Sequence, residues 1–194
     1  MTKTEITRDD IISMEEYSAG RKESRARMTG VKRTRRMACG PDAMFFFESY
    51  ETMWHQVHEM LFIEKGGEEQ IPDELSAYNP LIPNGCELVA TLMFEIDDPQ
   101  RRAAFLAGLG GVEETITIEF DGETVKGVPE EDVDRTTADG KASSVQFIHF
   151  PFTDEQVKKF KAADRIMVGI AHAKYGHISI MPEETKAALV SEFS

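Results

Sequence analysis

The sequence has few cysteines and no long apolar stretch. Its two cysteines, Cys39 and Cys86, form neither a CxxC motif nor a disulfide framework. No apolar run approaches the roughly 20 residues that a membrane span needs. The N-terminal residues lack the apolar segment of a secretory signal. These absences predict a reduced, cytoplasmic protein that does not enter a membrane.

Positive charge is scarce outside the N-terminal segment. The formal net charge is −13 over 194 residues. Residues 1–36 hold 10 Lys and Arg against 6 Asp and Glu, whereas residues 37–194 hold 12 against 29. An acidic body repels phosphate backbones, so nucleic acid is excluded as a general partner. The basic segment 21–36 could bind an anion or a partner, but we favour contact with the acidic body of the protein itself.

Motifs for phosphate binding and nucleophilic catalysis are also missing. The glycines at 108, 110 and 111 do not form GxGxxG and follow a predicted helix, so they mark the end of that helix. Neither cysteine has an activating neighbour in the sequence, and there is no GxSxG motif. The sequence therefore gives no local support for either chemistry.

The stretch 44–64 is the apolar segment around which we expect the chain to fold. At about 100° per residue, a helix over this stretch places its large apolar side chains on one broad arc. These side chains are Phe47, Tyr50, Met53, Trp54, Val57, Met60 and Leu61. The pattern predicts one long amphipathic helix that begins after a turn at 40–42.

The rest of the chain predicts an α+β fold in a single domain, 1–194, with an antiparallel sheet and further helices near both ends. Thr7 and Asp10 resemble a capping box, which predicts a helix to about Met28 that ends at Gly30 and packs on the body or on a partner. The predicted strands are 31–39, 86–96, 112–120, 124–128, 144–152 and 165–172, and the predicted later helices are 98–109, 153–163 and 182–190. Residues 129–142 are predicted to form an acidic loop.

Opposite the apolar arc, the predicted central helix carries a polar strip of Glu48, Glu51, His55, His58 and Glu59. Imidazole and carboxylate groups at helical spacing can bind a transition metal. His172 and His177 follow a predicted strand and could complete such a site. The simpler alternative is a solvated polar face, which every amphipathic helix has.

The sequence resembles an uncharacterised bacterial family known only as a domain of unknown function. The resemblance covers nearly the whole chain. Its most specific parts are the run 78–83 and the pairing of Gln56 with Glu59 and Met60. Its other residues are Arg35, Arg36, Gly40, Phe47, Glu48, Thr52, Glu64, Glu74, Leu75, Ala90, Thr91, Leu92, Met93, Glu95, Val145, Phe150, His172 and Tyr175.

This resemblance makes His55 and His58 weaker candidates for site residues, because they are not among the motif residues of the family. It favours Glu48, Thr52, Gln56 and Glu59, together with two arginines and His172. The resemblance also implies company with rubrerythrin-like and iron–sulfur oxidoreductase proteins, an association from which no chemistry follows.

Three hypotheses follow for the function. The first is a non-enzymatic accessory of a redox or oxidative-stress system that binds a metal centre or a redox partner, alone or as a homo-oligomer. Its predicted ligand-binding residues are Arg33, Arg35, Arg36, Glu48, Gln56, Glu59, Tyr78 and Asn79. The second is a small enzyme with Glu59 and His172 as its acid–base pair and an arginine anion clamp. The third is an internal, purely structural network of arginines and glutamates.

Overall fold

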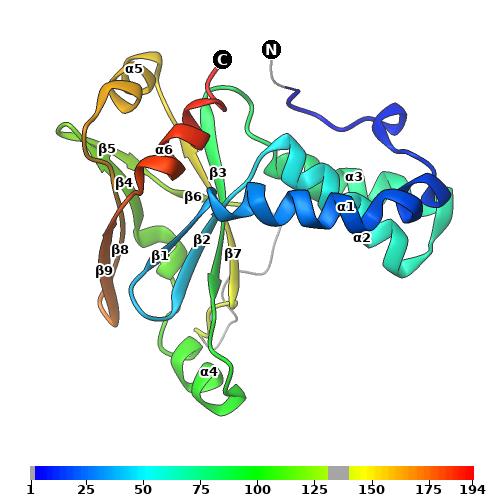
Figure 1. The fold of residues 1–194 in the computed structure, drawn as a ribbon. Helices are drawn as coiled ribbons and strands as arrows, with labels where there is room; N and C mark the ends of the chain where they lie inside the picture. Colours follow the sequence, from blue (N-terminus) through cyan, green and yellow to red (C-terminus); the bar gives the residue numbers. More distant parts are fainter. Residues whose placement is uncertain (1–2, 131–139) are drawn as a thin grey trace.

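The computed structural model describes residues 3–130 and 140–194. Two antiparallel sheets form its centre (Figure 1). The larger sheet has the order β1 (Arg36–Cys39), β2 (Ala43–Phe47), β3 (Glu87–Phe94), β7 (Val145–Pro151) and β6 (Val128–Pro129). The smaller sheet has the order β5 (Glu123–Lys126), β4 (Ile116–Phe120), β8 (Met167–His172) and β9 (Tyr175–Ile180). The predicted α+β class is confirmed, with the strands divided between two sheets.

The main core lies between the two sheets, because alternate side chains along the strands point into this space and are apolar. In β2, Phe45 and Phe47 point into this core, whereas Phe46 lies on the outer face of the larger sheet. Leu92 and Phe150 contribute from β3 and β7 and are fully buried. The alternation therefore leaves a second face of the larger sheet for the helices to cover.

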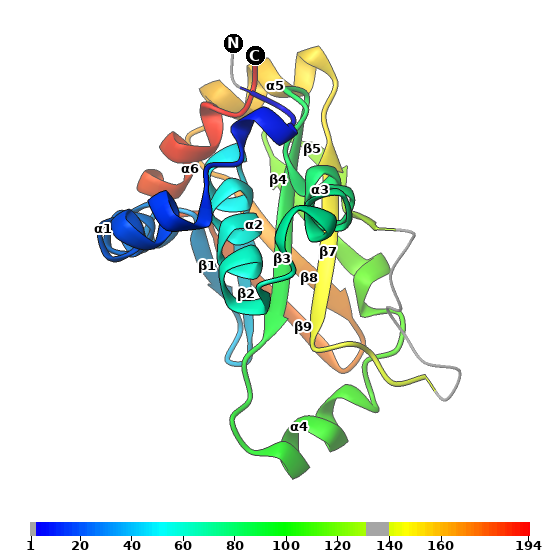
Figure 2. The same ribbon diagram turned by 90° about the vertical axis from the view of Figure 1, so that its right-hand side faces the viewer.

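Helices α1 (Met14–Arg33), α2 (Tyr50–Glu64) and α3 (Ile71–Tyr78) lie on that outer face (Figure 2). Helices α5 (Asp154–Ala162) and α6 (Glu183–Val190) lie near one end of the sheets, and α4 (Pro99–Leu106) lies near the other (Figure 1). Short 3₁₀ turns complete the fold at Arg8–Asp10, Gly67–Gln70, Asn79–Leu81 and Val112–Thr115. None of the described helices has the length and apolar character needed to cross a membrane.

The stretch 29–49 differs from its prediction. Helix α1 continues through Gly30 to Arg33, so the predicted strand 31–39 begins only at Arg36. The predicted helix 44–64 is split into strand β2 and helix α2, whose N-cap is Ser49. Ser49 and Thr52 form a capping box that starts α2 after the chain has left the sheet. The structure thereby places Glu48 at a junction and not on the helix.

The N-terminal segment wraps around α2 and α3 (Figure 2). The Asn79 side chain accepts a hydrogen bond from the Ile6 backbone N–H at 2.8 Å and donates one to the Ile6 carbonyl at 2.9 Å. The Trp54 indole donates to the Asp10 carbonyl at 2.8 Å. The predicted capping box of Thr7 and Asp10 is present, but it caps the 3₁₀ turn Arg8–Asp10 and not the long helix. Of the predicted loop 129–142, residues 131–139 lie outside the described part of the chain.

Candidate functional site

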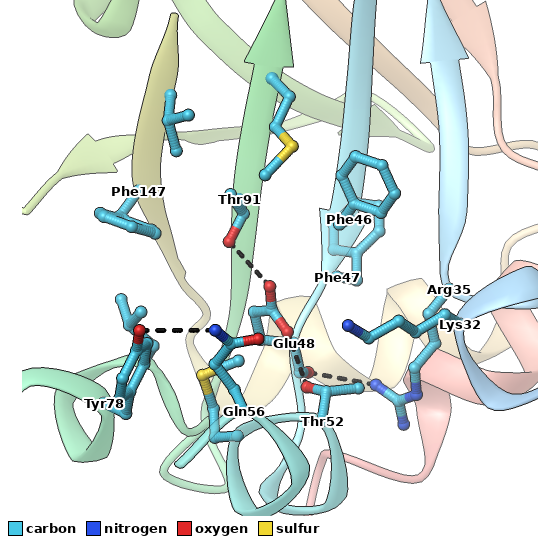
Figure 3. Close-up of a pocket in the computed structure, with 14 residues that line it drawn as sticks. Lys32, Arg35, Phe46, Phe47, Glu48, Thr52, Gln56, Tyr78, Thr91 and Phe147 are labelled. Carbon is cyan, nitrogen blue, oxygen red and sulfur yellow. Dashed lines mark hydrogen bonds between the residues drawn. The ribbon is translucent and has the colours of Figure 1, made fainter. Parts of the chain in front are cut away.

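A pocket of about 260 Å³ lies on the outer face of the larger sheet (Figure 3). Its walls come from strands β2, β3 and β7 and from the adjoining ends of α1, α2 and α3. Phe46, Thr91 and Phe147 are direct cross-strand neighbours and form one row across it. The apolar walls consist of Phe46, Phe47, Met53, Leu81, Met93, Val145 and Phe147. Such an apolar hollow with a few polar groups is typical of small-molecule sites.

Glu48 is the buried acid of this pocket. The Thr52 hydroxyl donates to its Oε2 at 2.6 Å, and the Thr91 hydroxyl donates to its Oε1 at 2.7 Å. Burial raises the pKa of the Glu48 carboxyl above its usual range, while the two hydroxyls and the positive charge of Lys32 oppose that rise. The two threonines fix the orientation of the carboxyl group and leave each oxygen a further lone pair.

The other polar groups of the pocket are Lys32, Gln56 and Tyr78. The Gln56 amide N–H lies 3.5 Å from the Tyr78 hydroxyl, which is the limit of a hydrogen bond. Lys32 comes from the last turn of α1, and its ammonium points toward the pocket (Figure 3). Gln56, Tyr78 and Glu48 were predicted as ligand-binding residues, and the structure brings these three together.

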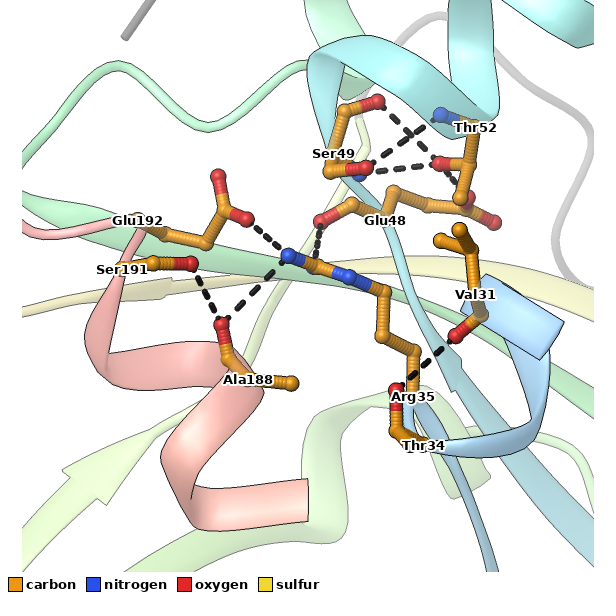
Figure 4. Close-up of polar contacts among 9 residues, drawn as sticks. All are labelled: Val31, Thr34, Arg35, Glu48, Ser49, Thr52, Ala188, Ser191 and Glu192. Atoms are coloured by element: carbon orange, nitrogen blue, oxygen red, sulfur yellow. Dashed lines mark hydrogen bonds and ion pairs between the residues drawn. The ribbon is translucent and has the colours of Figure 1, made fainter. Parts of the chain in front are cut away.

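Arg35 also borders the pocket, but its guanidinium is occupied by structural contacts (Figure 4). Nη1 donates to the backbone carbonyl of Glu48 at 3.1 Å, and Nη2 donates to the carbonyl of Ala188 at 3.4 Å. Nη2 also pairs with the carboxylate of Glu192, and both side chains are at least nine-tenths buried. Arg35 therefore ties the C-terminal segment to the start of α2 and is not an open anion clamp.

Glu59 is held by helix α1 and does not face this pocket. The Tyr17 hydroxyl donates to its Oε1 at 2.7 Å, and Arg21 donates to both carboxylate oxygens at 2.8 Å. The hydrogen bonds from Arg21 are the main reason why the pKa of Glu59 falls to about 2. The contacts of Glu59 agree with the hypothesis of an internal network.

The polar strip of α2 is therefore not a solvated face, because α1 packs against it. His55 is buried, with its Nδ1 lying 3.3 Å from the Tyr17 hydroxyl and 3.4 Å from the Ser24 hydroxyl. Glu51 pairs with Arg27 at the exposed edge of the same contact. As we favoured from the charge distribution, arginines of the basic segment lie against acids of the protein itself.

His58 is a buried structural residue. Its Nδ1–H donates to the Trp54 carbonyl at 2.7 Å, and its Nε2 accepts from the Ile12 N–H at 3.2 Å. Both ring nitrogens are thus used by the neutral imidazole, and burial lowers the pKa of His58 below its usual range. With both nitrogens engaged, His58 has no lone pair to offer a metal ion.

The remaining predicted metal ligands lie elsewhere. His172 and His177 belong to the β8–β9 hairpin of the smaller sheet, across the larger sheet from α2 (Figures 1 and 2). Throughout the described residues, no three side chains of His, Cys, Asp or Glu come together as a metal-binding group. The structure does not assemble Glu51, His55, His58, His172 and His177 into one site. For the same reason Glu59 and His172 do not form an acid–base pair.

Three further predicted ligand-binding residues have other places. Arg33 and Arg36 are exposed near the end of α1 and the start of β1. Asn79 is occupied by the backbone of Ile6, as described above. Sequence reasoning missed Lys32 and the row of Phe46, Thr91 and Phe147. The available signal was the strand propensity of three consecutive aromatic residues, Phe45 to Phe47, but a helix prediction over the same residues obscured it.

Two histidines with opposite pKa shifts give a testable pH dependence. The pKa of His149 is raised, first by its hydrogen bond to Glu87 at 3.2 Å and also by Glu130 at 2.9 Å. Its contribution to stability is full below the unfolded pKa of about 6.5 and is lost as the pH rises through the folded value. The lowered pKa of His58 has the reverse effect, because stability is lost as the pH falls below about 6.5.

We therefore expect His58→Gln and His149→Gln to differ in the pH profile of their stability loss between about pH 5 and 8. The free energy of unfolding, measured by urea denaturation for each variant and the wild type, gives this loss at each pH. The loss should grow with rising pH for His58→Gln and shrink with rising pH for His149→Gln, each by at most about 1.4 kcal/mol per pH unit. Parallel profiles for the two variants would contradict the assigned environments.

The fold and the pocket define an α+β protein with a ligand-sized hollow between a sheet and its helix layer. The chain belongs to the family described as "Protein of unknown function (DUF3501)", whose model matches residues 5–193. This confirms the resemblance seen in the sequence. The chain is also similar to a crystallised protein of unknown function from Burkholderia pseudomallei K96243, with 33% sequence identity, a TM-score of 0.90 and 100% of each chain covered. A comparison with curated proteins found no match.

Proposed function

We propose that this protein binds a small, largely apolar molecule in the pocket on the outer face of the larger sheet. The observation that carries the proposal is the combination of an apolar hollow of about 260 Å³ with the buried, doubly hydrogen-bonded carboxyl of Glu48. Burying a carboxyl group costs free energy that an apolar side chain at the same position would not cost. The presence of Glu48 beside a hollow therefore supports a binding role.

The apolar walls support the same role. Phe46, Met93 and Phe147 remain only partly buried although they lie on a sheet face otherwise covered by helices. Covering such surface stabilises a complex by about 25 cal/mol per Å² of apolar area removed from water. A ligand that fills the hollow would complete the helix layer at this position.

Methyl NMR of methionine-labelled protein tests the proposal, because Met53 and Met93 line the pocket. With a library of small aromatic and aliphatic fragments, we expect some to shift these two methyl signals with affinities of about 1 mM or tighter. The signal of Met28, which is buried on α1, should not move.

Val145→Trp is the matched control, since an indole at this wall would fill the hollow. The same fragments should no longer shift the signals of Met53 and Met93 in this variant. If no fragment moves these signals in the wild type, or if Val145→Trp leaves the shifts unchanged, the pocket does not bind small molecules.

An accessory role in a redox system is a second proposal, with cytoplasmic location and rubrerythrin-like or iron–sulfur partners. The observation that favours it is the exposure of Arg33 and Arg36, which could contact an acidic partner while Arg35 is buried. Metal analysis and a visible absorption spectrum of untagged protein test the metal-binding half of this proposal. If the protein holds a stoichiometric metal ion and the variants Glu59→Ala and His172→Ala still hold it, the ligands of the metal are not these two predicted residues.

A further inference from the structure

An acidic and a basic side chain face the pocket without pairing. Glu48 stands at the junction of β2 and α2, and Lys32 stands in the last turn of α1. Figure 3 shows the Lys32 ammonium pointing toward the side of the pocket that holds the Glu48 carboxyl. Within the described part of the chain, the Lys32 ammonium has neither a hydrogen-bond nor an ion-pair partner. The positive charge of Lys32 nevertheless acts on Glu48, because it opposes the rise in the pKa of the Glu48 carboxyl group.

The other charged group of the wall does not change this balance. Arg35 is neutralised by Glu192, and its Nη1 and Nη2 also donate to the backbone carbonyls of Glu48 and Ala188. Among the described residues that line the pocket, a ligand therefore meets one unpaired cation, Lys32, and one carboxyl group, Glu48. It also meets the Tyr78 hydroxyl and the Gln56 amide, whose mutual contact at 3.5 Å is weak enough to be exchanged for a better one.

This arrangement selects among head groups. An anionic head could pair with Lys32 but would bring a second negative charge beside Glu48, and a cationic head would meet the reverse problem. A head with a hydrogen-bond donor on one side and an acceptor on the other satisfies both groups at once. The row of Phe46, Thr91 and Phe147 and the neighbouring Val145 then receive the apolar body.

We propose that the pocket takes a dipolar ligand, whose head presents an N–H donor to Glu48 and an acceptor oxygen to Lys32 and whose body is apolar or aromatic. This inference rests on the proposed function of the same pocket. Two sources share the chemistry: a zwitterion of the amino-acid type, with an ammonium and a carboxylate, and a neutral amide or lactam, with an N–H and a carbonyl.

A series of compounds with the same phenyl body tests the head group. The series consists of toluene, hydrocinnamate, phenethylamine, hydrocinnamamide and L-phenylalanine, titrated into the wild-type protein with the methyl signals of Met53 and Met93 as the readout. At least one of the two dipolar compounds, hydrocinnamamide and L-phenylalanine, should bind about tenfold or more tighter than both singly charged compounds. Which of the two binds more tightly distinguishes the neutral from the zwitterionic source.

Lys32→Met tests the role of the cation, because it keeps a long apolar stem and removes only the charge. In this variant the advantage of the dipolar compounds over toluene should fall about tenfold, while toluene binds as in the wild type. Lys32→Gln, which keeps a donor, should retain part of the advantage of hydrocinnamamide. A thermal denaturation curve for each variant confirms that it is folded.

The outcomes separate this inference from the proposed function. If hydrocinnamate or phenethylamine binds as tightly as the dipolar compounds, or if Lys32→Met changes nothing, the dipolar ligand is wrong. If toluene binds and all head groups are equivalent, the pocket binds small molecules but does not select a dipole. If none of the five compounds shifts the signals of Met53 and Met93, this inference is overturned, and the fragment library then decides whether the pocket binds anything else.

Discussion

Replacing Arg35 with alanine is expected to lower the free energy of unfolding by about 3–5 kcal/mol. The substitution leaves the carboxylate of Glu192 buried without its partner, since the Glu192 side chain is only 4% exposed. It also removes the donors to the carbonyls of Glu48 and Ala188. Urea denaturation followed by circular dichroism measures the loss, and Glu192→Ala should cause one of similar size.

The size of this effect depends on burial, and the chain offers an internal control. The pair of Arg27 and Glu51 joins α1 to α2, but its side chains are 58% and 37% exposed. Arg27→Ala is expected to cost no more than about 1 kcal/mol. The double variant Arg35→Met with Glu192→Leu should recover most of the lost stability, because it leaves no buried charge. If Arg35→Ala and Arg27→Ala cost the same, the buried pair does not hold the C-terminal segment in place.

The part of the fold that was predicted correctly carries its signals locally. Asp98 followed by Pro99 starts α4, and Thr153 starts α5 through a capping box. The hairpin between β4 and β5 turns at Asp121 and Gly122, both of which have positive φ. In each case a few adjacent residues supply the hydrogen bonds or the backbone conformation that the element needs.

The stretch 29–49 was predicted wrongly because tertiary contacts outweigh its local signals. Glycine is a frequent helix stop, yet α1, which packs on α2 through the buried Met28 and the ion pairs of Arg21 and Arg27, passes through Gly30. The penalty for glycine within a helix is only about 1 kcal/mol, so a single glycine is a weak stop signal. Helix α1 then also shields the polar strip of α2, so no pattern within α2 alone could show that His55 and His58 are buried.

The candidate site was predictable only in part for the same reason. Glu48, Gln56 and Tyr78 could be named from the sequence, and they meet at one pocket. Lys32 was missed because its place depends on where α1 ends. The partner of Arg35 could not be found by spacing, since Glu192 lies 157 residues away along the chain. Contacts between side chains on separate helices and strands can be identified only when the packing of these elements is known.

Tyr175→Phe is expected to destabilise the protein by about 2–4 kcal/mol, although it removes a single oxygen atom. The Tyr175 hydroxyl accepts from the backbone N–H groups of Asp42 and Ala43, both at 3.0 Å, and donates to the Cys39 carbonyl at 2.9 Å. It thereby holds the β1–β2 turn of the larger sheet against β9 of the smaller one. Phenylalanine would remove these three hydrogen bonds, and a buried group that is left unsatisfied costs about 1–3 kcal/mol.

Gly40→Ala, in the same turn, should be equally destabilising. Its φ is +75°, and a Cβ atom there would lie 2.7 Å from the Tyr175 hydroxyl and 2.6 Å from the His177 ring. The control is Tyr78→Phe. Among the described residues its hydroxyl has one polar contact, the 3.5 Å approach of Gln56, so its loss should change stability by less than about 0.5 kcal/mol. Thermal denaturation of the three variants compares them directly. An equal, small loss for Tyr175→Phe and Tyr78→Phe would mean that the two sheets are held together by apolar packing alone, whereas the expected gap assigns Tyr175 the role of the polar link between them.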